Sequence, residues 1–166
     1  TFFEQELRRM DTERFLPLTI IIGDVNGLKL VNDTFGHAAG DRLLAHAARL
    51  LGSSLRRSDI LCRWGGDEFA LLVPNVDEAA AQDIVDRIRT TVSAAEPDPI
   101  PVSVALGSCT KHSVDESIQA VIREAEERMY RSKLFEAKGA HDSLVASLER
   151  TLWQKTDETR EHARRV

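Results

Sequence analysis

The sequence predicts an α+β domain built on a ferredoxin-like βαββαβ sheet with flanking helices. Three observations lead to this prediction: a β-branched apolar run at residues 18–22, two short strand-like segments on either side of Gly65-Gly66, and amphipathic segments of helical periodicity between the strands. With a first helix set aside, the predicted elements follow one another as strand, helix, strand, strand, helix and strand. A chain of this order forms a mostly antiparallel sheet, and we expect helices on one of its faces.

The first elements are a helix and a buried strand. We expect the helix over residues 2–14, where apolar side chains recur at near-helical spacing, and Pro17 ends that segment. The run 18–22 suits a central strand that is buried on both faces. Asp24 stands at the polar end of this strand, where the backbone would hold a metal-binding carboxylate rigidly; the alternative is a helix N-cap.

Two helical segments follow. A short helical turn over 27–35 is separated by Gly36 from an amphipathic helix over 39–55. Further along, a helix is expected over 77–94.

The two glycines are predicted to join two strands, near 59–63 and 68–73. Because paired glycines between strands are typical of a tight hairpin turn, we expect Asp67 and Glu68 at an exposed tip, beside backbone that a ligand can approach closely. In the predicted sheet this hairpin lies beside the end of the first strand, so Asp24 and Asp67 should converge.

The last predicted elements are a strand over 100–107, with Pro101 at its beginning or on a sheet edge, and a helix over 114–135. From residue 139 the apolar stripe becomes narrow and the sequence highly charged. We interpret residues 139–166 as a linker helix outside the core.

The composition is that of one soluble globular domain. The chain has 166 residues, enough for a single sizeable core, of which 42% are hydrophobic and 30% charged. No apolar run approaches the roughly 20 residues of a membrane span, so no membrane partner is expected in this part of the protein. The net charge of −5 argues against a non-specific nucleic-acid binder. Cys62 and Cys109 form neither a disulfide framework nor a metal-binding spacing, and a reducing cytoplasm is the expected location.

Three motifs, in this order along the chain, resemble those of one family. Residues 65–69 (Gly-Gly-Asp-Glu-Phe) resemble the signature of the GGDEF family, the diguanylate cyclases, and residues 24–41 and 125–133 are similar to two further motifs of that family. The resemblance covers residues 1–138 and implies a nucleotidyl cyclase fold, related to polymerase palm domains. It also implies an enzyme that condenses two GTP molecules into cyclic di-GMP and pyrophosphate, with two domains facing each other in a homodimer.

The resemblance also implies the metal site and the catalytic acids. Phosphoryl transfer depends on positioning and charge neutralisation, for which two Mg²⁺ (or Mn²⁺) ions per GTP site are a common solution. The implied ligands are the carboxylates of Asp24 and Asp67 and the carbonyl oxygen of Val25, with Glu68 as a further acid on the metal side. Asp67 and Glu68 are the implied catalytic residues, Asp67 helping to deprotonate the attacking hydroxyl. The alternative is that both are ordinary solvated turn acids.

The implied substrate-binding residues are Lys29, Asn32, His37, Asp41, Gly65, Gly66 and Lys133. Asn32 and Asp41 would hydrogen-bond to the guanine edge, which rejects bases that lack the matching groups. The lysines would contact the β- and γ-phosphates as point charges. For most of these the alternative is an ordinary cap or surface residue, and His37 suits the nucleotide pocket or a backbone contact at Gly36 equally well.

An inhibitory site for the product is implied by Arg56 and Asp59, which match the family's Arg-x-x-Asp motif, with Arg87 as a second arginine from a neighbouring surface. Arginine can form paired hydrogen bonds with phosphate or guanine, and aspartate can accept from guanine. The alternative is an exposed charged turn.

The chain departs from the family at several positions. Ala137 stands where the family often has an arginine, and Asn26 and Leu28 replace a common acid and a common phenylalanine. The segment that usually precedes the first helix is missing, so we interpret the chain as a fragment of a longer protein.

Residues 155–166 resemble the opening helix of HD-type phosphohydrolase domains, which implies adjoining sensor and hydrolase domains. A catalytically weak domain that binds GTP or cyclic di-GMP and regulates such a phosphodiesterase is therefore the alternative function. A pure dimerisation or linker domain is a third.

Overall fold

The computed structural model describes residues 2–98, 100–135, 145–146 and 149. Its four strands form one antiparallel sheet in the order β2-β3-β1-β4: β1 (Leu18–Val25), β2 (Ile60–Arg63), β3 (Glu68–Pro74) and β4 (Val104–Lys111). The helices are α1 (Phe2–Met10), a 3-10 turn (Glu13–Phe15), α2 (Leu28–Phe35), α3 (His37–Ser53) and α4 (Glu78–Ala94), followed by helical residues 118–135. The element order confirms the predicted α+β class and its βαββαβ core.

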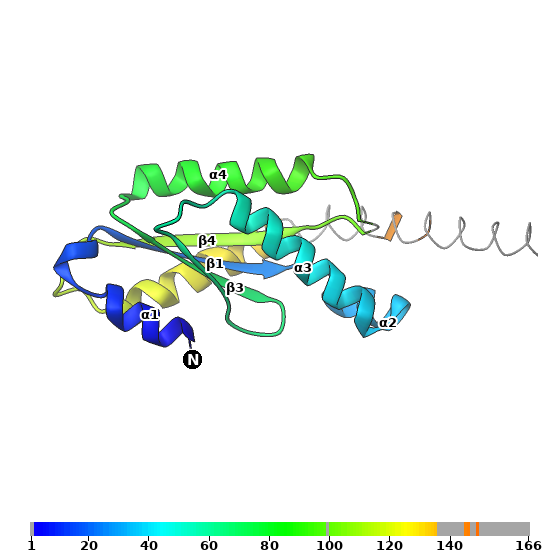
Figure 1. Ribbon diagram of the computed structural model, residues 1–166, viewed down its shortest axis with the longest axis horizontal. Coiled ribbons are helices and arrows are strands. Elements are labelled where there is room, and N and C mark those ends of the chain that lie inside the picture. The colour runs from blue at the N-terminus through cyan, green and yellow to red at the C-terminus, as the bar shows by residue number, and fades with distance from the viewer. Residues whose placement is uncertain (1, 99, 136–144, 147–148, 150–166) are drawn as a thin grey trace, which may run out of the picture.

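Helices cover both faces of the sheet, so the expectation of helices on one face was wrong (Figure 1). One apolar core lies between the sheet and α2, α3 and α4, and a second lies between the sheet and α1 with the 118–135 helix. The second layer comes from the helices that precede and follow the βαββαβ core. It buries the face of β1 that carries Ile20 and Ile22, whereas Ile21 points into the first core; all three are fully buried.

The register of the central strands decides which side chains share a face. Asp24 of β1 lies opposite Glu68 of β3, and Ile22 lies opposite Ala70. Because directly opposed residues point to the same side of a sheet, Asp24 and Glu68 both lie on the face covered by α1 and the 118–135 helix.

The last strand is shifted from its predicted position, since it begins at Val104 and continues to Lys111. The strand begins at Val104 because its partner β1 ends at Val25, the residue that pairs with Val104. Gly107 does not end the strand but lies within it. A Cβ built there would be 2.1 Å from the backbone nitrogen of Met129 and 2.3 Å from the carbonyl oxygen of Ala125, so the glycine allows the 118–135 helix to pack directly on β4.

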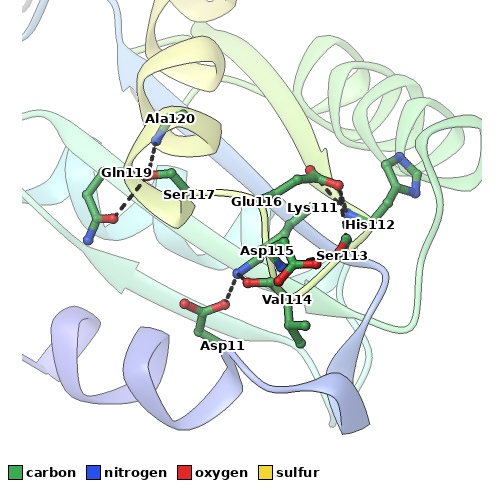
Figure 2. Close-up of polar contacts among 10 residues, drawn as sticks. All are labelled: Asp11, Lys111, His112, Ser113, Val114, Asp115, Glu116, Ser117, Gln119 and Ala120. Atoms are coloured by element: carbon green, nitrogen blue, oxygen red, sulfur yellow. Dashed lines mark hydrogen bonds and ion pairs between the residues drawn. The ribbon is translucent and has the colours of Figure 1, made fainter.

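The final helix begins at residue 118 rather than at 114. The loop before it is held by Glu116, whose carboxylate accepts hydrogen bonds from the backbone N–H groups of His112 and Ser113 (Figure 2). These local bonds satisfy the backbone in a non-helical conformation and delay the helix.

The hairpin connection is longer than the predicted two-residue turn. Arg63 and Phe69 are the last paired residues, and the backbone N–H groups of Trp64 and Gly65 both donate to the carbonyl of Glu68. Gly65 and Gly66 do not have positive φ; among the described glycines, Gly27 and Gly36 do. The hairpin acids are half-buried rather than exposed, because the hairpin leans against the end of β1.

No helix in the described residues is long and apolar enough to cross a membrane. The predicted linker helix over 139–166 lies almost entirely outside the residues that the structure describes. That interpretation, and the division at residue 138, stay predictions.

Candidate functional site

An acidic cluster lies at one end of the sheet, where β1 ends and β3 begins. Asp24 and Glu68 are paired across the two strands, and Asp67 precedes Glu68 in the hairpin. The backbone carbonyl of Asp67 accepts a hydrogen bond from the N–H of Val25 at 2.9 Å, which ties the hairpin to the end of β1. Residues more than 40 positions apart in the chain therefore share one site, as the predicted topology required.

Burial and neighbouring carboxylates raise the pKa of Asp24 and of Glu68. Burial is the largest cause of the raised pKa of Asp24, and the charge of Asp67 adds to it. Burial also raises the pKa of Glu68, followed by the charges of Asp24, Asp67 and Glu126. Burial and the neighbouring negative charges thus both disfavour the ionised forms of Asp24 and Glu68.

Lys133 supplies a positive charge to this cluster. It comes from the 118–135 helix, and its Nζ donates a hydrogen bond to Asp24 Oδ1 at 2.8 Å. This bond and the lysine's charge lower the pKa of Asp24 and oppose the effect of burial. The phosphate contact expected of Lys133 stays a prediction, as does that of Lys29, which is exposed on α2.

The donor set fits a hard divalent cation. Carboxylate and carbonyl oxygens are the ligands that Mg²⁺ prefers, and the ammonium of Lys133 shows that one oxygen of Asp24 already attracts a cation. Within the described residues, no three His, Cys, Asp or Glu side chains already surround a common point. Asp24, Asp67, Glu68 and the carbonyl of Val25 are the groups in this region that could hold a metal.

A hollow of about 480 Å³ lies between α3 and the β2-β3 hairpin, and Phe69, which lines it, directly follows Glu68 in β3. Its lining combines apolar side chains with the carboxylate of Asp41 and the guanidinium of Arg63; the apolar residues include Leu44, Leu61 and Phe69. A planar base with hydrogen-bond donors on its edge suits such a lining.

Asn32 and His37 lie near the junction of α2 and α3. Gly36 ends α2 and precedes α3 with φ of +81°, a backbone conformation that favours glycine. The Oδ1 atom of Asn32 is buried and has no hydrogen-bond partner in the part of the chain that the structure describes. His37 is exposed as the first residue of α3.

Sequence reasoning missed two contacts that support the hairpin. Arg63 donates to the carbonyl of Gly66 at 2.6 Å and to that of Gly65 at 3.2 Å, so its guanidinium braces the loop that carries Asp67. The ring of Trp64 packs against Phe3 of α1 at a centroid distance of 5.1 Å. The signal for both was their place directly before the two glycines, but the partners could not be identified without the fold.

The three residues of the expected inhibitory site lie on neighbouring parts of the surface. In the turn before β2, Asp59 accepts from the backbone N–H of Arg56 at 2.7 Å. Arg87 reaches from α4 to the carbonyl of Ser54 at 2.8 Å, which places it beside that turn. Their role as a ligand site stays a prediction.

Known proteins resemble the chain in both sequence and structure. The family model described as diguanylate cyclase, GGDEF domain, matches residues 1–138. Diguanylate cyclase A of Treponema denticola is 32% identical over 120 residues, which cover 70% of this chain and 32% of that protein. The chain thus spans about a third of the length of this curated relative.

Two solved structures have similar folds. Diguanylate cyclase SiaD of Pseudomonas aeruginosa, crystallised with its activator SiaC, has a TM-score of 0.71 and 29% identity, over 80% of this chain and 53% of that one. The GGDEF domain of DgcB from Caulobacter crescentus, crystallised with c-di-GMP, has a TM-score of 0.69 and 26% identity, over 79% of this chain and 82% of that one.

Proposed function

The chain belongs to the GGDEF family of diguanylate cyclases, and from that premise we propose that it condenses two GTP molecules into cyclic di-GMP. The observation that carries the proposal is the acidic cluster of Asp24, Asp67 and Glu68, together with a hollow of suitable size for a base between α3 and the hairpin that carries two of these acids. Acids at this density attract a divalent cation, and the neighbouring hollow places a nucleotide within reach of it.

The reaction forms two phosphodiester bonds. In each half, the 3′-oxygen of one GTP attacks the α-phosphorus of the other, the bond from that phosphorus to the pyrophosphate oxygen breaks, and pyrophosphate leaves. Asp67 accepts the proton of the attacking hydroxyl. Two Mg²⁺ (or Mn²⁺) ions, when bound, supply charge neutralisation for the triphosphate. Asp24, Asp67 and the carbonyl of Val25 would hold these ions, with Glu68 as a further acid.

The remaining residues bind and orient the substrate. Asn32 and Asp41 hydrogen-bond to the guanine edge, and Lys29 and Lys133 contact the β- and γ-phosphates once Lys133 leaves Asp24. Since one domain binds one GTP, catalysis requires a homodimer in which two such sites face each other.

The test is product formation from GTP and Mg²⁺ by the purified chain held as a dimer. We expect cyclic di-GMP and pyrophosphate, and we expect Asp67→Asn to lower the turnover number by about 10²–10⁴-fold, the usual contribution of a general base. Asp83→Asn, an exposed acid on α4, is the matched control and should leave turnover unchanged. A folded, dimeric wild-type protein that forms no cyclic di-GMP would rule out the enzymatic function.

A second candidate is a binding domain that holds GTP or cyclic di-GMP and regulates an adjoining phosphodiesterase. Ala137, in place of the arginine common in the family, favours it because one phosphate contact is lost. Calorimetry separates the two functions: nucleotide binding with no turnover supports the second. The adjoining sensor and HD-type domains and the cytoplasmic location belong to this proposal as well.

A further inference from the structure

Gly40 is an unusual residue for its position in the structure. It is the fourth residue of the 17-residue helix α3, and it is buried. Glycine inside a helix loses more conformational entropy on folding than alanine does, so it weakens the helix unless its missing side chain serves a purpose.

The side chain of Asn32 occupies the space that a side chain at Gly40 would need. A Cβ built on Gly40 would be 2.0 Å from Asn32 Oδ1, 2.9 Å from Asn32 Cγ and 3.0 Å from Leu28 Cδ1. Gly52 in the same helix differs, since a Cβ there would meet only Leu61 Cδ2, at 3.7 Å. The close contact therefore belongs to Gly40 and not to glycines of α3 in general.

The amide that fits against Gly40 is incompletely satisfied by the protein. Asn32 Oδ1 is buried without a hydrogen-bond partner among the described residues. A buried polar atom without a partner is costly, so this position of the amide is not explained by hydrogen bonding of that oxygen. Asn32 is held in place by its fit against α3 rather than by hydrogen bonds to that oxygen.

We propose that Gly40 is a positioning residue for base recognition: its missing side chain lets the Asn32 amide lie against α3 in the orientation that binds the purine base. The inference rests on the proposed function, because it takes Asn32 as a contact to guanine. A methyl group at position 40 forces the Asn32 side chain to rotate, and the amide then no longer meets the base.

Nucleotide selectivity tests the proposal with Gly40→Ala, using Gly52→Ala as the matched control. The probes are non-hydrolysable analogues of GTP and ATP, measured by calorimetry with Mg²⁺. We expect Gly40→Ala to weaken binding of the GTP analogue at least tenfold and to leave weak binding of the ATP analogue unchanged. Gly52→Ala should bind both as the wild type does. If Gly40→Ala weakens binding of the GTP analogue and of the ATP analogue by the same factor, its effect is a general loss of structure, and the proposal is overturned.

A double-mutant cycle tests whether Gly40 acts through Asn32. In the Asn32→Ala background, Gly40→Ala should no longer lower the midpoint of urea unfolding, because the clash with the amide is gone and only the contact with Leu28 Cδ1 opposes the gain in helix stability. In the wild-type background it should lower that midpoint. The ratio of the affinities for the GTP and ATP analogues should be the same in the double variant as in Asn32→Ala alone. Additive effects in stability or in selectivity would overturn the proposal.

These results are distinguishable from failure of the proposed function. If the wild type prefers the GTP analogue but forms no cyclic di-GMP, the enzymatic function fails and the role of Gly40 stands. If Gly40→Ala binds the GTP analogue as tightly as the wild type, the role of Gly40 fails and the enzymatic function stands. A wild type that binds neither analogue overturns both.

Discussion

Asp24 shows how strongly a single residue depends on its surroundings. Its residue exposure is 6%, and burial alone would favour the protonated acid. The hydrogen bond from Lys133 favours the ionised form of Asp24 instead, and the side chain of Lys133 is far more exposed than that of Asp24. Because Lys133 is partly exposed and flexible, a divalent cation can displace it. The pair therefore favours the ionised form of Asp24 and still leaves the carboxylate available to a metal.

The raised pKa of Glu68 predicts a pH dependence of stability. A carboxyl group whose pKa is higher in the folded protein binds more protons when folded, so between the two pKa values stability falls as pH rises. Because the ordinary pKa of Glu68 is 4.5, we expect the free energy of unfolding to decline as pH rises above it. Glu68→Gln should make this decline shallower, as measured by urea unfolding across a pH series.

The control for this measurement is Glu96→Gln, an exposed acid in the loop after α4. It should leave the pH profile of the wild type unchanged. An equal slope in the wild type and in Glu68→Gln would contradict the prediction.

The turn before β2 predicts product inhibition. If cyclic di-GMP binds at Arg56, Asp59 and Arg87, then Arg56→Ala removes charge-assisted hydrogen bonds to the product. We expect the inhibition constant to rise by about tenfold or more, with the uninhibited rate unchanged. The measurement is the initial rate against added cyclic di-GMP. Arg57→Ala, the neighbouring exposed arginine, is the control, and equal inhibition of both variants would remove the basis for the site.

At the scale of secondary-structure elements, α1 is joined to the sheet by a buried ion pair far from the acidic cluster. Figure 2 shows Asp11, just after α1, meeting the ammonium of Lys111 at the end of β4. The side chain of Lys111 is only 2% exposed, and that of Asp11 is 27% exposed. Lys111 lies opposite Leu18, the first residue of β1, so this contact is at the other end of the strand from Asp24.

Removing one partner of this pair should be costly. Asp11→Ala leaves a buried ammonium without its carboxylate, and we expect it to lower the free energy of unfolding by about 3 kcal/mol. The double variant Asp11→Ala with Lys111→Met should recover much of that loss, because the buried charge is gone. Chemical denaturation measures both. Equal destabilisation by the single and double variants would show that the ion pair is not what joins α1 to β4.

At the scale of the whole molecule, the two parts of the candidate site lie on opposite faces of the sheet, each beside one of the two apolar cores. The acidic cluster lies on the face covered by α1 and the 118–135 helix, whereas the hollow lies beside α3, which covers the opposite face. A bound nucleotide would therefore extend around the end of the sheet. The similarity to solved GGDEF domains supports this nucleotidyl cyclase architecture.

The proposed dimeric mechanism predicts a dependence on protein concentration. Below the dissociation constant of the dimer, the rate per molecule should rise in proportion to the protein concentration, because only dimers are active. A dilution series of initial rates, with dimer content followed by light scattering, measures this. A rate per molecule that stays constant while the dimer dissociates would contradict the proposed dimeric mechanism.

Several features of the fold followed from local patterns. The run 18–22 predicted a strand buried on both faces, which the structure confirms. The same run should have indicated helices on both faces, since a strand buried on both sides requires cover on both. The bounds of β4 were wrong for a local reason, because a glycine inside a strand resembles a strand end until its packing partner is known.

The sequence by itself determined the order of the elements, the buried central strand and the family motifs, because periodicity and short motifs are local properties of the chain. The tertiary structure decided which distant groups meet. Lys133 contacts Asp24 from 109 residues away, Arg63 braces the glycine loop, and the amide of Asn32 fills the space beside Gly40. Such contacts depend on register and on helix packing, which place side chains within a few ångströms of one another without leaving any pattern along the chain.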